Sequence, residues 1–411
     1  MNPEYFIAKR LVAAKSGKSS ISSPIIKIAV WAIAISMAMM VVSVATGTGL
    51  QQKIRAKLAA FNGHILISNF EDNQSEITAT PISTHQSFYP TFTGVSGIHH
   101  VQAVATKAGI IRTATDFEGI IFKGVGKEYD WSNIAEYLVA GRMPNVKHNL
   151  NAEVLLPQYL ADRLKLKPGD RFTTYFMKDN SWKMPNLRVF TVVGIFNSGF
   201  QEIDGTFVIG DIRHIQRMNK WRPDEVGAFE VFLDDFGQME EKGREVYNAT
   251  GSFLRSRTIA DKYAYLFEWV KLFDFNILVI IGIMIVVSTI DMVVALLVLI
   301  LERTRMIGIL KAMGASNWSI RKIFLYNAFH LILRGLLLGN GIAIGLLLLQ
   351  KYTGIIRLDP ESYYVTTAPV NLDWIYILLL NVITVGICLL VLVIPSWVIT
   401  KISPVKAIRF D

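Results

Sequence analysis

Long apolar runs interrupt the chain at four places. Each run is close to or above the roughly 20 residues that an α-helix needs to cross the hydrocarbon core of a bilayer. Only helices and closed barrels satisfy their backbone hydrogen bonds in that environment, so each run is expected to be helical. The four runs are residues 28–46, 275–301, 323–349 and 374–399. The pattern therefore predicts four transmembrane helices.

The residues between the first and second runs, 51–270, have the mixed polar and apolar pattern of a soluble domain. Apolar runs of strand length alternate there with helix-like stretches such as 157–166 and 212–219. This alternation predicts a mixed α+β domain. The strand-length runs are residues 64–68, 101–105, 119–122, 190–194, 206–210 and 229–233.

A β-hairpin is predicted within this domain. Residues 167–170, Lys-Pro-Gly-Asp, are a turn signal that leads into a strand at 171–176. A second strand at 187–196 is expected to pair with the first across the polar segment 178–186.

Composition narrows the class of protein. The 411 residues are 52% apolar and only 18% charged, with one Cys. A disordered chain is poor in apolar residues and a disulfide-stapled secreted scaffold is rich in Cys, so both classes are excluded. The fold class that remains is a membrane protein with four transmembrane α-helices (1 + 3) and a large mixed α+β domain between the first and the second.

Basic residues indicate the orientation, because short cytoplasmic segments hold an excess of Lys and Arg near the ends of the spans. Such residues precede the first run, separate the second from the third and follow the fourth, so both termini are expected to be cytoplasmic. The net charge of +9 then reflects topology, and no nucleic-acid partner is expected. The basic residues are Lys9, Arg10, Lys15, Lys18, Lys27, Arg303, Arg305, Lys311, Arg321, Lys322, Lys401, Lys406 and Arg409.

The first run is interpreted as a retained membrane anchor. It exceeds the h-region of a signal peptide, and residues 46–49 are a poor cleavage site. The preceding residues 3–15 place Phe6 and Leu11 among basic residues, a pattern typical of an amphipathic helix in the inner membrane interface. The alternative is a frayed basic tail.

No constellation for catalysis or metal binding stands out. The histidines lack the spacing of metal ligands, and no Gly-x-Ser-x-Gly elbow frames a serine. Residues 17–19, Gly-Lys-Ser, lack the first glycine of a phosphate loop, since Val12 occupies that place. Cys388 lies within the fourth run, where it is expected to be buried and inert. The chain is therefore not expected to be an enzyme, or to bind a metal or cofactor of its own.

The segment between the second and third runs predicts a short amphipathic helix. Gly314 is suited to end that helix in the left-handed conformation, and Ser316 is suited to cap the next helix. The helix would present an apolar ridge outside the membrane, or it would only anchor the loop at the interface. Its apolar positions are Met306, Ile309, Leu310 and Met313.

This segment resembles the coupling helix of ABC-transporter permeases of the lipoprotein-releasing LolC/LolE type, which are relatives of FtsX and of the MacB efflux permease. The family pattern is Glu-Arg, then Ile-Gly-Ile-Leu-Lys-Ala-Met-Gly-Ala, then Ile-Arg-Lys-Ile-Phe, and residues 302–324 contain all of it. The resemblance extends over essentially the whole chain. Further similar segments are residues 5–11, 191–196, 204–205, 356–365, 369–370, 395–397 and 404–409.

The resemblance implies a permease subunit in the bacterial inner (cytoplasmic) membrane, with the large domain periplasmic. ATP and Mg would bind to a separate ABC ATPase subunit, and a second permease chain, identical or paralogous, would complete the transporter. The substrate would be an acylated lipoprotein, extracted from membrane lipids and passed to a periplasmic carrier and the outer membrane. The expected ATPase-coupling residues are Glu302, Arg303, Met306, Gly308, Ile309, Leu310, Met313 and Gly314.

Two further sites are suggested for this function. Met37, Met40 and Val44 in the first run could form an adaptable wall for acyl chains, with ordinary bundle or lipid packing as the alternative. The tip of the predicted hairpin lies where LolC-type chains carry a carrier-docking hook, and it is shorter here. Trp182 and Met184 are its candidate carrier-docking residues.

Three polar residues inside the runs depart from the family's usual small or uncharged residues. A charge at mid-depth costs about 2.5 to 3.5 kcal/mol on insertion scales, so Asp291 and Arg334, at similar depth, are predicted to pair. The alternative is that Arg334 reaches to the headgroups. His330 is the third residue, and two small-xxx-small faces nearby suit close helix contact. Those faces are Gly335 with Gly339 and Gly341 with Gly345.

Two other functions remain open: a MacB-like efflux or mechanotransmission permease, and an FtsX-like regulator of cell-wall hydrolases. Neither changes the predicted layout of the chain. Its boundaries are 1–23 (amphipathic helix), 24–49 (first span), 50–270 (periplasmic domain), 271–301 (second span), 302–322 (coupling loop), 323–350 (third span), 351–372 (periplasmic loop), 373–399 (fourth span) and 400–411 (cytoplasmic tail).

Overall fold

The computed structural model describes residues 4, 22–72, 80–113, 116–177 and 185–402. They form two compact units. We call residues 1–51, 269–357 and 367–411 the helical bundle, and residues 52–268 with 358–366 the inserted domain. Apart from residue 4, the expected amphipathic helix at 3–15 lies outside the described residues, as do the hairpin-tip residues Trp182 and Met184, so these predictions stay predictions.

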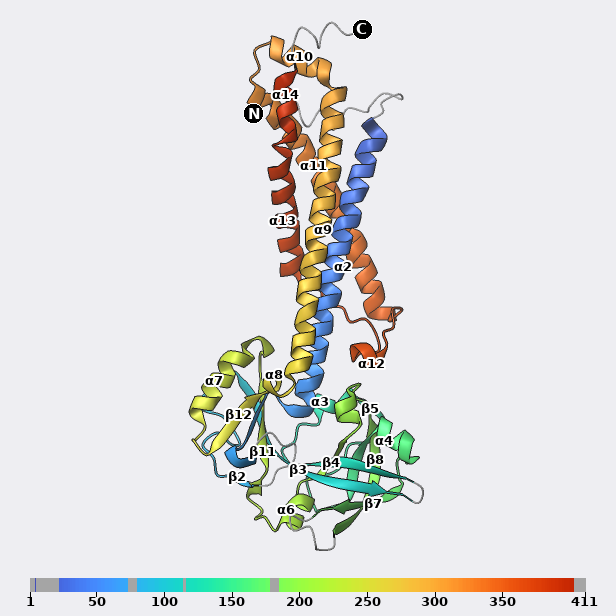
Figure 1. Ribbon diagram of the computed structural model, residues 1–411, viewed down its shortest axis with the longest axis vertical. Helices are drawn as coiled ribbons and strands as arrows, with labels where there is room; N and C mark the ends of the chain where they lie inside the picture. Colours follow the sequence, from blue (N-terminus) through green and yellow to red (C-terminus); the bar gives the residue numbers. More distant parts are fainter. Residues whose placement is uncertain (1–3, 5–21, 73–79, 114–115, 178–184, 403–411) are drawn as a thin grey trace. The chain divides into compact units, whose positions relative to one another are not determined.

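Long helices dominate the helical bundle, and in Figure 1 they run side by side. Within the described residues, four stretches are long and apolar enough to cross a membrane, which confirms the predicted number of spans: 24–62, 264–302, 317–353 and 374–401. The elements of this region are α2 (Ser22–Asn62), α9 (Ala264–Glu302), α10 (Thr304–Ala312), α11 (Asn317–Thr353), α13 (Trp374–Leu392), η3 (Pro395–Trp397) and α14 (Val398–Lys401).

One apolar core joins these helices, with buried residues from α2, α9, α11 and α13. Close contact between α2 and α11 depends on glycine. A Cβ added at Gly335 would lie 2.7 Å from Cβ of Ile33, and one at Gly339 would lie 2.5 Å from the backbone O of Ala34. The first small-xxx-small face therefore packs as predicted. On the second face, a Cβ added at Gly345 would meet no atom of the described residues within 4 Å.

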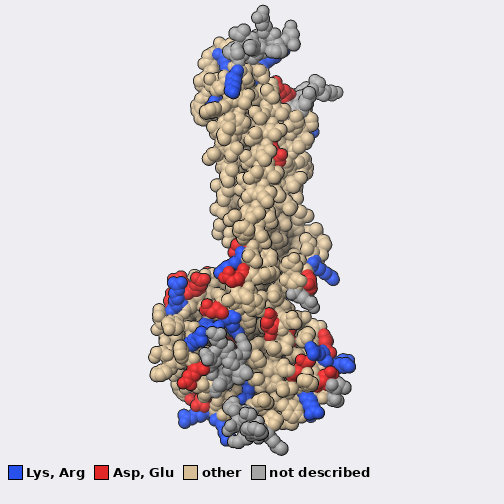
Figure 2. Space-filling view, viewed as in Figure 1, with Lys and Arg blue, Asp and Glu red and all other residues tan. Residues whose placement is uncertain are grey.

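Charged side chains are unevenly spread over each unit. On the face shown in Figure 2, the middle of the helical bundle is almost free of Lys, Arg, Asp and Glu, and charged side chains lie toward its two ends. The inserted domain shows both signs of charge interspersed over its surface. This is the surface expected of a lipid-embedded bundle and a water-exposed domain.

A twisted sheet forms the centre of the inserted domain, in the order β12-β1-β11-β3-β4-β9-β6-β8-β5, with β7 pairing both β3 and β8. Among the described strands, only β4 with β9 and β6 with β8 pair in parallel. The strands of the domain are β1 (Ile65–Asn69), β2 (Ile82–Ser83), β3 (Ile98–Arg112), β4 (Phe117–Val125), β5 (Leu138–Gly141), β6 (Glu153–Pro157), β7 (Arg171–Phe176), β8 (Asn186–Phe196), β9 (Phe207–Asp211), β10 (Glu225–Val226), β11 (Ala228–Leu233) and β12 (Leu254–Thr258).

Short helices and turns connect these strands. The helical elements are η1 (Phe70–Asp72), α3 (Ser132–Ala135), α4 (Gln158–Leu164), α5 (Gln201–Asp204), α6 (Arg213–Asn219), η2 (Phe236–Gln238), α7 (Met239–Ala249), α8 (Ile259–Lys262) and α12 (Pro360–Tyr363). Each of the six predicted strand-length runs lies in or overlaps an observed strand, and β7 pairs with β8 as the predicted hairpin. Strands β2, β5, β6, β10 and β12 and helix α7 were not predicted from the sequence.

A buried polar network ties the end of α2 into the sheet. Nζ of Lys123 on β4 donates to the backbone O of Phe61 at 2.6 Å and to Glu230 on β11 at 2.5 Å. Both charged side chains are only 4% exposed. Nε2 of Gln102 donates to the second oxygen of Glu230, and Asn62 accepts bonds from Lys262 and Tyr263 where α9 is about to begin. Within the inserted domain, the end of α2 is therefore hydrogen-bonded to β4 and to the residues just before α9.

Candidate functional site

The candidate site for coupling to another subunit is helix α10 and the residues around it, at the end of the helical bundle (Figure 1). The local sequence sets its limits. Gly314 has a φ of +88°, the left-handed conformation that ends a helix. Oγ of Ser316 accepts the backbone N–H of Ser319 and so caps α11. Both predicted signals are confirmed, and they fold the segment into a short helix and a sharp turn.

The structure divides the expected apolar ridge into two faces. Ile307 belongs to the bundle core, and Met306 and Leu310 pack against that core. Ile309 is 51% exposed and Met313 71% exposed, and Trp318 at the start of α11 is 52% exposed. The accessible part of the predicted ridge is therefore Ile309 and Met313, and Trp318 extends it. We call these three residues the apolar triplet.

The other predicted coupling residues frame this triplet. Glu302 is exposed at the end of α9, and Arg303 is the half-buried N-cap residue of α10. Gly308 is buried beside Ile307, which is fully buried. Gly314 is exposed next to Met313. Gly308 thus contributes to seating α10 on the bundle, whereas Gly314 lies on its accessible side.

A lysine fixes α10 to the end of the last helix. Nζ of Lys311 donates to the backbone O of Ile399 at 2.7 Å and of Ile402 at 2.8 Å. Ile399 lies in α14 and Ile402 directly follows its last residue, at the C-terminal end of a helix, where a cation is favourable. Burial lowers the pKa of the Lys311 ammonium. The sequence indicated only that Lys311 is one of the basic residues on the cytoplasmic side, and it did not predict these hydrogen bonds to the end of the last helix.

The intramembrane polar residues do not come together as predicted. Within the described residues, neither Asp291 nor Arg334 takes part in an ion pair. Gly335 turns its face of α11 toward α2, which leaves Arg334 exposed on the neighbouring face, as the headgroup alternative requires. The third residue, His330, is half-buried, and its Nδ1 donates to the backbone O of Tyr326 at 2.9 Å.

The methionine face of the first span lies inside the bundle. Met37 and Met40 are fully buried and Val44 is 8% exposed, and all three belong to the apolar core. Their burial agrees with the alternative interpretation, in which these residues pack the bundle and do not line a path for acyl chains. Val44 also borders a small hollow with Asp373 and Tyr376.

A polar contact that the sequence did not suggest joins α11 to α13. Nδ2 of Asn340 donates to Oδ1 of Asn381 at 2.8 Å, and Nδ2 of Asn381 returns a bond at 3.3 Å. A reciprocal amide pair satisfies both side chains without a charge, which suits an apolar bundle. The available signal was the presence of Asn residues inside apolar runs, Asn327 and Asn340 in the third run and Asn381 in the fourth, and that signal does not identify the partner.

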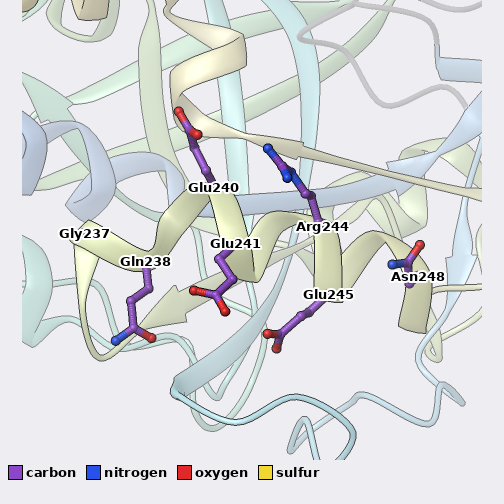
Figure 3. Close-up of a pocket in the computed structure, with 7 residues that line it drawn as sticks. All are labelled: Gly237, Gln238, Glu240, Glu241, Arg244, Glu245 and Asn248. Atoms are coloured by element: carbon purple, nitrogen blue, oxygen red, sulfur yellow. The ribbon is translucent and has the colours of Figure 1, made fainter.

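Chemical sites are scarce in the inserted domain. The hollow drawn in Figure 3 is lined by polar side chains of α7 and by Gly237 and Gln238 of η2, which directly precedes α7 in the chain. Residues of one helix face cannot surround a ligand, so no role is assigned to this hollow. Within the described residues, no group of three or more His, Cys, Asp or Glu is placed to hold a metal ion.

Two family descriptions match the chain. Residues 28–245 match the MacB-like periplasmic core domain, which is more than half of the chain. Residues 278–404 match the FtsX-like permease C-terminal domain. The two matches together follow the observed order of first span, inserted domain and three further spans.

Known relatives extend over nearly the whole length. The chain is 21% identical to the lipoprotein-releasing system transmembrane protein LolC of Neisseria meningitidis serogroup B, covering 99% of both chains. It is 21% identical to LolE of Haemophilus influenzae, again over 99% of both. The crystal structure of the periplasmic region of MacB from Actinobacillus actinomycetemcomitans is 17% identical, with a TM-score of 0.33, over 50% of this chain and 92% of that chain.

Together with the two family matches, the four membrane-length helices, the α/β domain between the first and second, and the amphipathic helix between the second and third place the chain among permeases of the ABC-transporter type. The chain belongs to the superfamily of permeases with a MacB-like periplasmic core domain and an FtsX-like C-terminal domain. Within that superfamily it resembles the LolC/LolE type over nearly its full length. It is a multi-pass membrane protein, and its inserted domain is the periplasmic domain of this family.

Proposed function

We propose that this chain is the transmembrane permease subunit of an ABC transporter that extracts lipoproteins from the inner membrane. A separate ATPase subunit hydrolyses ATP, and the lipoprotein passes to a periplasmic carrier on its way to the outer membrane. The near-full-length similarity to LolC and LolE proteins supports the lipoprotein-release assignment. The observation that carries the permease role is the apolar triplet on and beside α10, held in place by Lys311.

The triplet is suited to bind a protein groove. Exposed apolar side chains on a rigid short helix are the usual anchors of helix-in-groove recognition. Ile309 lies on α10 and Met313 is the C-cap residue of that helix, so their spacing of four residues places both side chains on the same side. Lys311 fastens the helix to α14, so a push on the triplet would be passed to the last span. We infer that this surface receives the ATPase subunit, with α10 on the cytoplasmic side.

An energy source is necessary for the proposed reaction. Each acyl CH₂ group withdrawn from the bilayer costs about 0.8 kcal/mol, so a lipoprotein with several acyl chains does not leave spontaneously at a useful rate. ATP hydrolysis in the partner subunit supplies the work. A second permease chain is needed to complete an enclosed path, since Met37 and Met40 are buried within this bundle and leave no open wall there.

Carrier docking is proposed at the end of the β7–β8 hairpin. Trp182 and Met184 of the hairpin tip remain its candidate residues. The described residues beside that tip support the proposal, because they form an open apolar surface: Met177 is 63% exposed and Phe117 is 77% exposed. Both line one hollow with Pro185.

Gentle purification from the native membrane, followed by mass spectrometry, tests the proposed function. We expect an ATPase subunit, a second permease chain and stoichiometric acylated lipoproteins. An ATPase without lipoproteins, or with an outer-membrane channel or a cell-wall hydrolase instead, would contradict lipoprotein release and favour efflux or signalling.

A matched pair of variants tests the triplet. Met313→Glu places a charge in the proposed interface, so recovery of the ATPase with the permease should fall by about tenfold or more, as for a central interface residue. Ile355→Glu is the control, because Ile355 is 65% exposed and lies in the loop after α11, away from α10 in the sequence. Equal loss of the ATPase from both variants, or from neither, would contradict the proposed surface.

A further inference from the structure

The loop between α11 and α13 belongs to the inserted domain, although the chain on both sides of it belongs to the helical bundle. Residues 358–366 cluster with residues 52–268, whereas Arg357 and Thr367 cluster with the bundle helices. The loop is therefore a second covalent route between the two units, besides the continuous helices α2 and α9. The loop can transmit movement between the units only if hydrogen bonds and packing hold both of its ends.

The bundle end of the loop is held by hydrogen bonds. Its two arms form a β-bridge between Arg357 and Thr367, and the backbone N–H of Ala368 donates to the O of Ile356 at 3.0 Å. The side chain of Gln350, in the last turn of α11, donates to both Ile356 and Ala368 and accepts the N–H of Ile356 at 2.8 Å. One glutamine thus joins both arms to α11.

The domain end is held by Tyr364. Its backbone has a φ of +60°, which costs a non-glycine residue conformational energy and persists only where contacts favour it. The ring stacks on Phe200 with centroids 4.8 Å apart and an angle of 19° between the planes. Phe200 is fully buried in the domain, and Val365 next to Tyr364 is 4% exposed. The loop is therefore seated in the domain and does not merely lie on it.

Lys57 connects this seat to α2. Its side chain is buried, and Nζ donates to the backbone O of Ser198 at 2.8 Å and of Tyr364 at 2.9 Å. Gly199 allows the approach, because a Cβ there would lie 3.1 Å from Nζ of Lys57 and 3.3 Å from the O of Tyr364. The ammonium also lies over the ring of Tyr137, 5.5 Å from its centroid, where a cation is attracted by the face of the ring.

Burying an ammonium destabilises a fold unless its N–H groups make hydrogen bonds. Here the Lys57 ammonium donates to two backbone carbonyls from segments far apart in the sequence. The second bond, to Tyr364, holds a segment whose two arms lead directly to α11 and α13.

We propose that Lys57 is a positioning residue that fastens the 358–366 loop to the inserted domain, so that the loop acts as a tether through which α11 and α13 move that domain during the ATP cycle. This inference rests on the proposed function, because it assumes that ATP-driven motion of the spans does work on the domain. Lys57 touches no substrate in this account; it transmits displacement.

Hydrogen exchange tests the fastening directly. In the purified full complex, Lys57→Met should raise amide exchange in peptides covering 358–366 and 198–204 by about tenfold, the equivalent of one charged hydrogen bond. Tyr364→Ser removes the stacked ring and should have the same effect without altering a buried position. Lys53→Met is the control, because Lys53 lies one turn away on α2 and pairs with Glu136 at the surface. Unchanged protection of 358–366 in Lys57→Met would overturn the proposal.

Coupling is tested by counting lipoproteins transferred to a carrier per ATP hydrolysed, in vesicles of native lipid composition. Lys57→Met and Tyr364→Ser should lower this ratio about fivefold or more, with the ATPase rate nearly unchanged. If a variant raises amide exchange in residues 358–366 but leaves the number of lipoproteins transferred per ATP unchanged, the proposed tether is wrong. If the wild-type complex transfers no lipoprotein, the proposed function fails, while the exchange comparison still decides whether Lys57 fastens the loop.

Discussion

The helical bundle and the inserted domain bury polar groups in different ways. The domain encloses an ion pair, Lys123 with Glu230, and completes it with bonds from Gln102 and to Phe61. The bundle joins its helices with a neutral pair, Asn340 with Asn381. Inside its spans, Arg334 is exposed and Asp291 is half-buried, and neither takes part in an ion pair within the described residues.

The difference follows from the solvent in which each unit assembles. A water-exposed domain can bury a charge if the partner and every remaining hydrogen bond are supplied, and it then loses much when one partner is removed. Lipid solvates charges poorly both around separated helices and around the assembled bundle. Helices in a membrane therefore associate through neutral amide pairs and close glycine contacts, and each such contact contributes less to stability than a buried ion pair loses when one partner is removed. Perturbations of the two units should therefore differ in size.

The largest effect is expected for Lys123→Met. The substitution leaves the Glu230 carboxylate buried without a counter-charge, which should lower the free energy of unfolding of the inserted domain by about 3 to 5 kcal/mol. Pulse proteolysis in urea, read on peptides of the domain, measures it. Arg142→Met is the comparison, because Arg142 pairs with Glu153 at the surface and should cost no more than about 1 kcal/mol. A similar loss of unfolding free energy in both variants would contradict the stated difference between a buried and a surface ion pair.

Acid should weaken the domain through His64. Burial lowers the pKa of His64 to about 4 from 6.5, and Nδ1 accepts the backbone N–H of Leu233. The unfolded chain therefore binds a proton at higher pH than the folded domain. This stabilisation is complete above pH 6.5 and is lost as the pH falls toward 4, amounting to about 3 kcal/mol at most.

Thermal unfolding between pH 7 and pH 4 checks this expectation. His64→Gln removes the titrating group while keeping an acceptor near Leu233. The variant should show a smaller loss of stability on acidification than the wild type. The same loss in both proteins would mean that other groups cause the acid sensitivity.

The helical bundle should respond to added volume at one glycine face and not at the other. Gly339→Val would force a side chain against Ala34 and Met37, which should destabilise the bundle by about 1 to 3 kcal/mol. Gly345→Val adds the same group on the same helix in open space. Thermal aggregation of the detergent-solubilised protein compares them, and equal stability of the two variants would contradict the observed packing of α2 on α11.

The smallest effect is expected for the amide pair. Asn340→Leu leaves Asn381 without its partner and should cost about 1 kcal/mol. Changing both residues to Leu removes the unpaired group and should recover part of the loss. The same thermal assay applies. A loss as large as that of Lys123→Met would show that the bundle depends on its polar contact as strongly as the domain does.

Sequence alone determined the features that depend on short stretches of chain. Apolar runs specified four spans, the Lys-Pro-Gly-Asp turn specified the β7–β8 hairpin, and Gly314 and Ser316 specified the limits of α10 and α11. Each is a matter of hydropathy, backbone conformation or capping within one or two helical turns, so neighbours in the sequence contain the information.

Tertiary structure alone decided which side chains meet. Lys57 and Tyr364 are 307 positions apart in the sequence, and Lys311 reaches a carbonyl 91 positions away. It also decided that Met37 faces the core and that Asp291 has no ion-pair partner among the described residues. Periodicity says that a helix has an apolar face, but the angle at which helices pack selects the residues in contact. Those contacts arise only when distant segments are brought together by burial of the whole core.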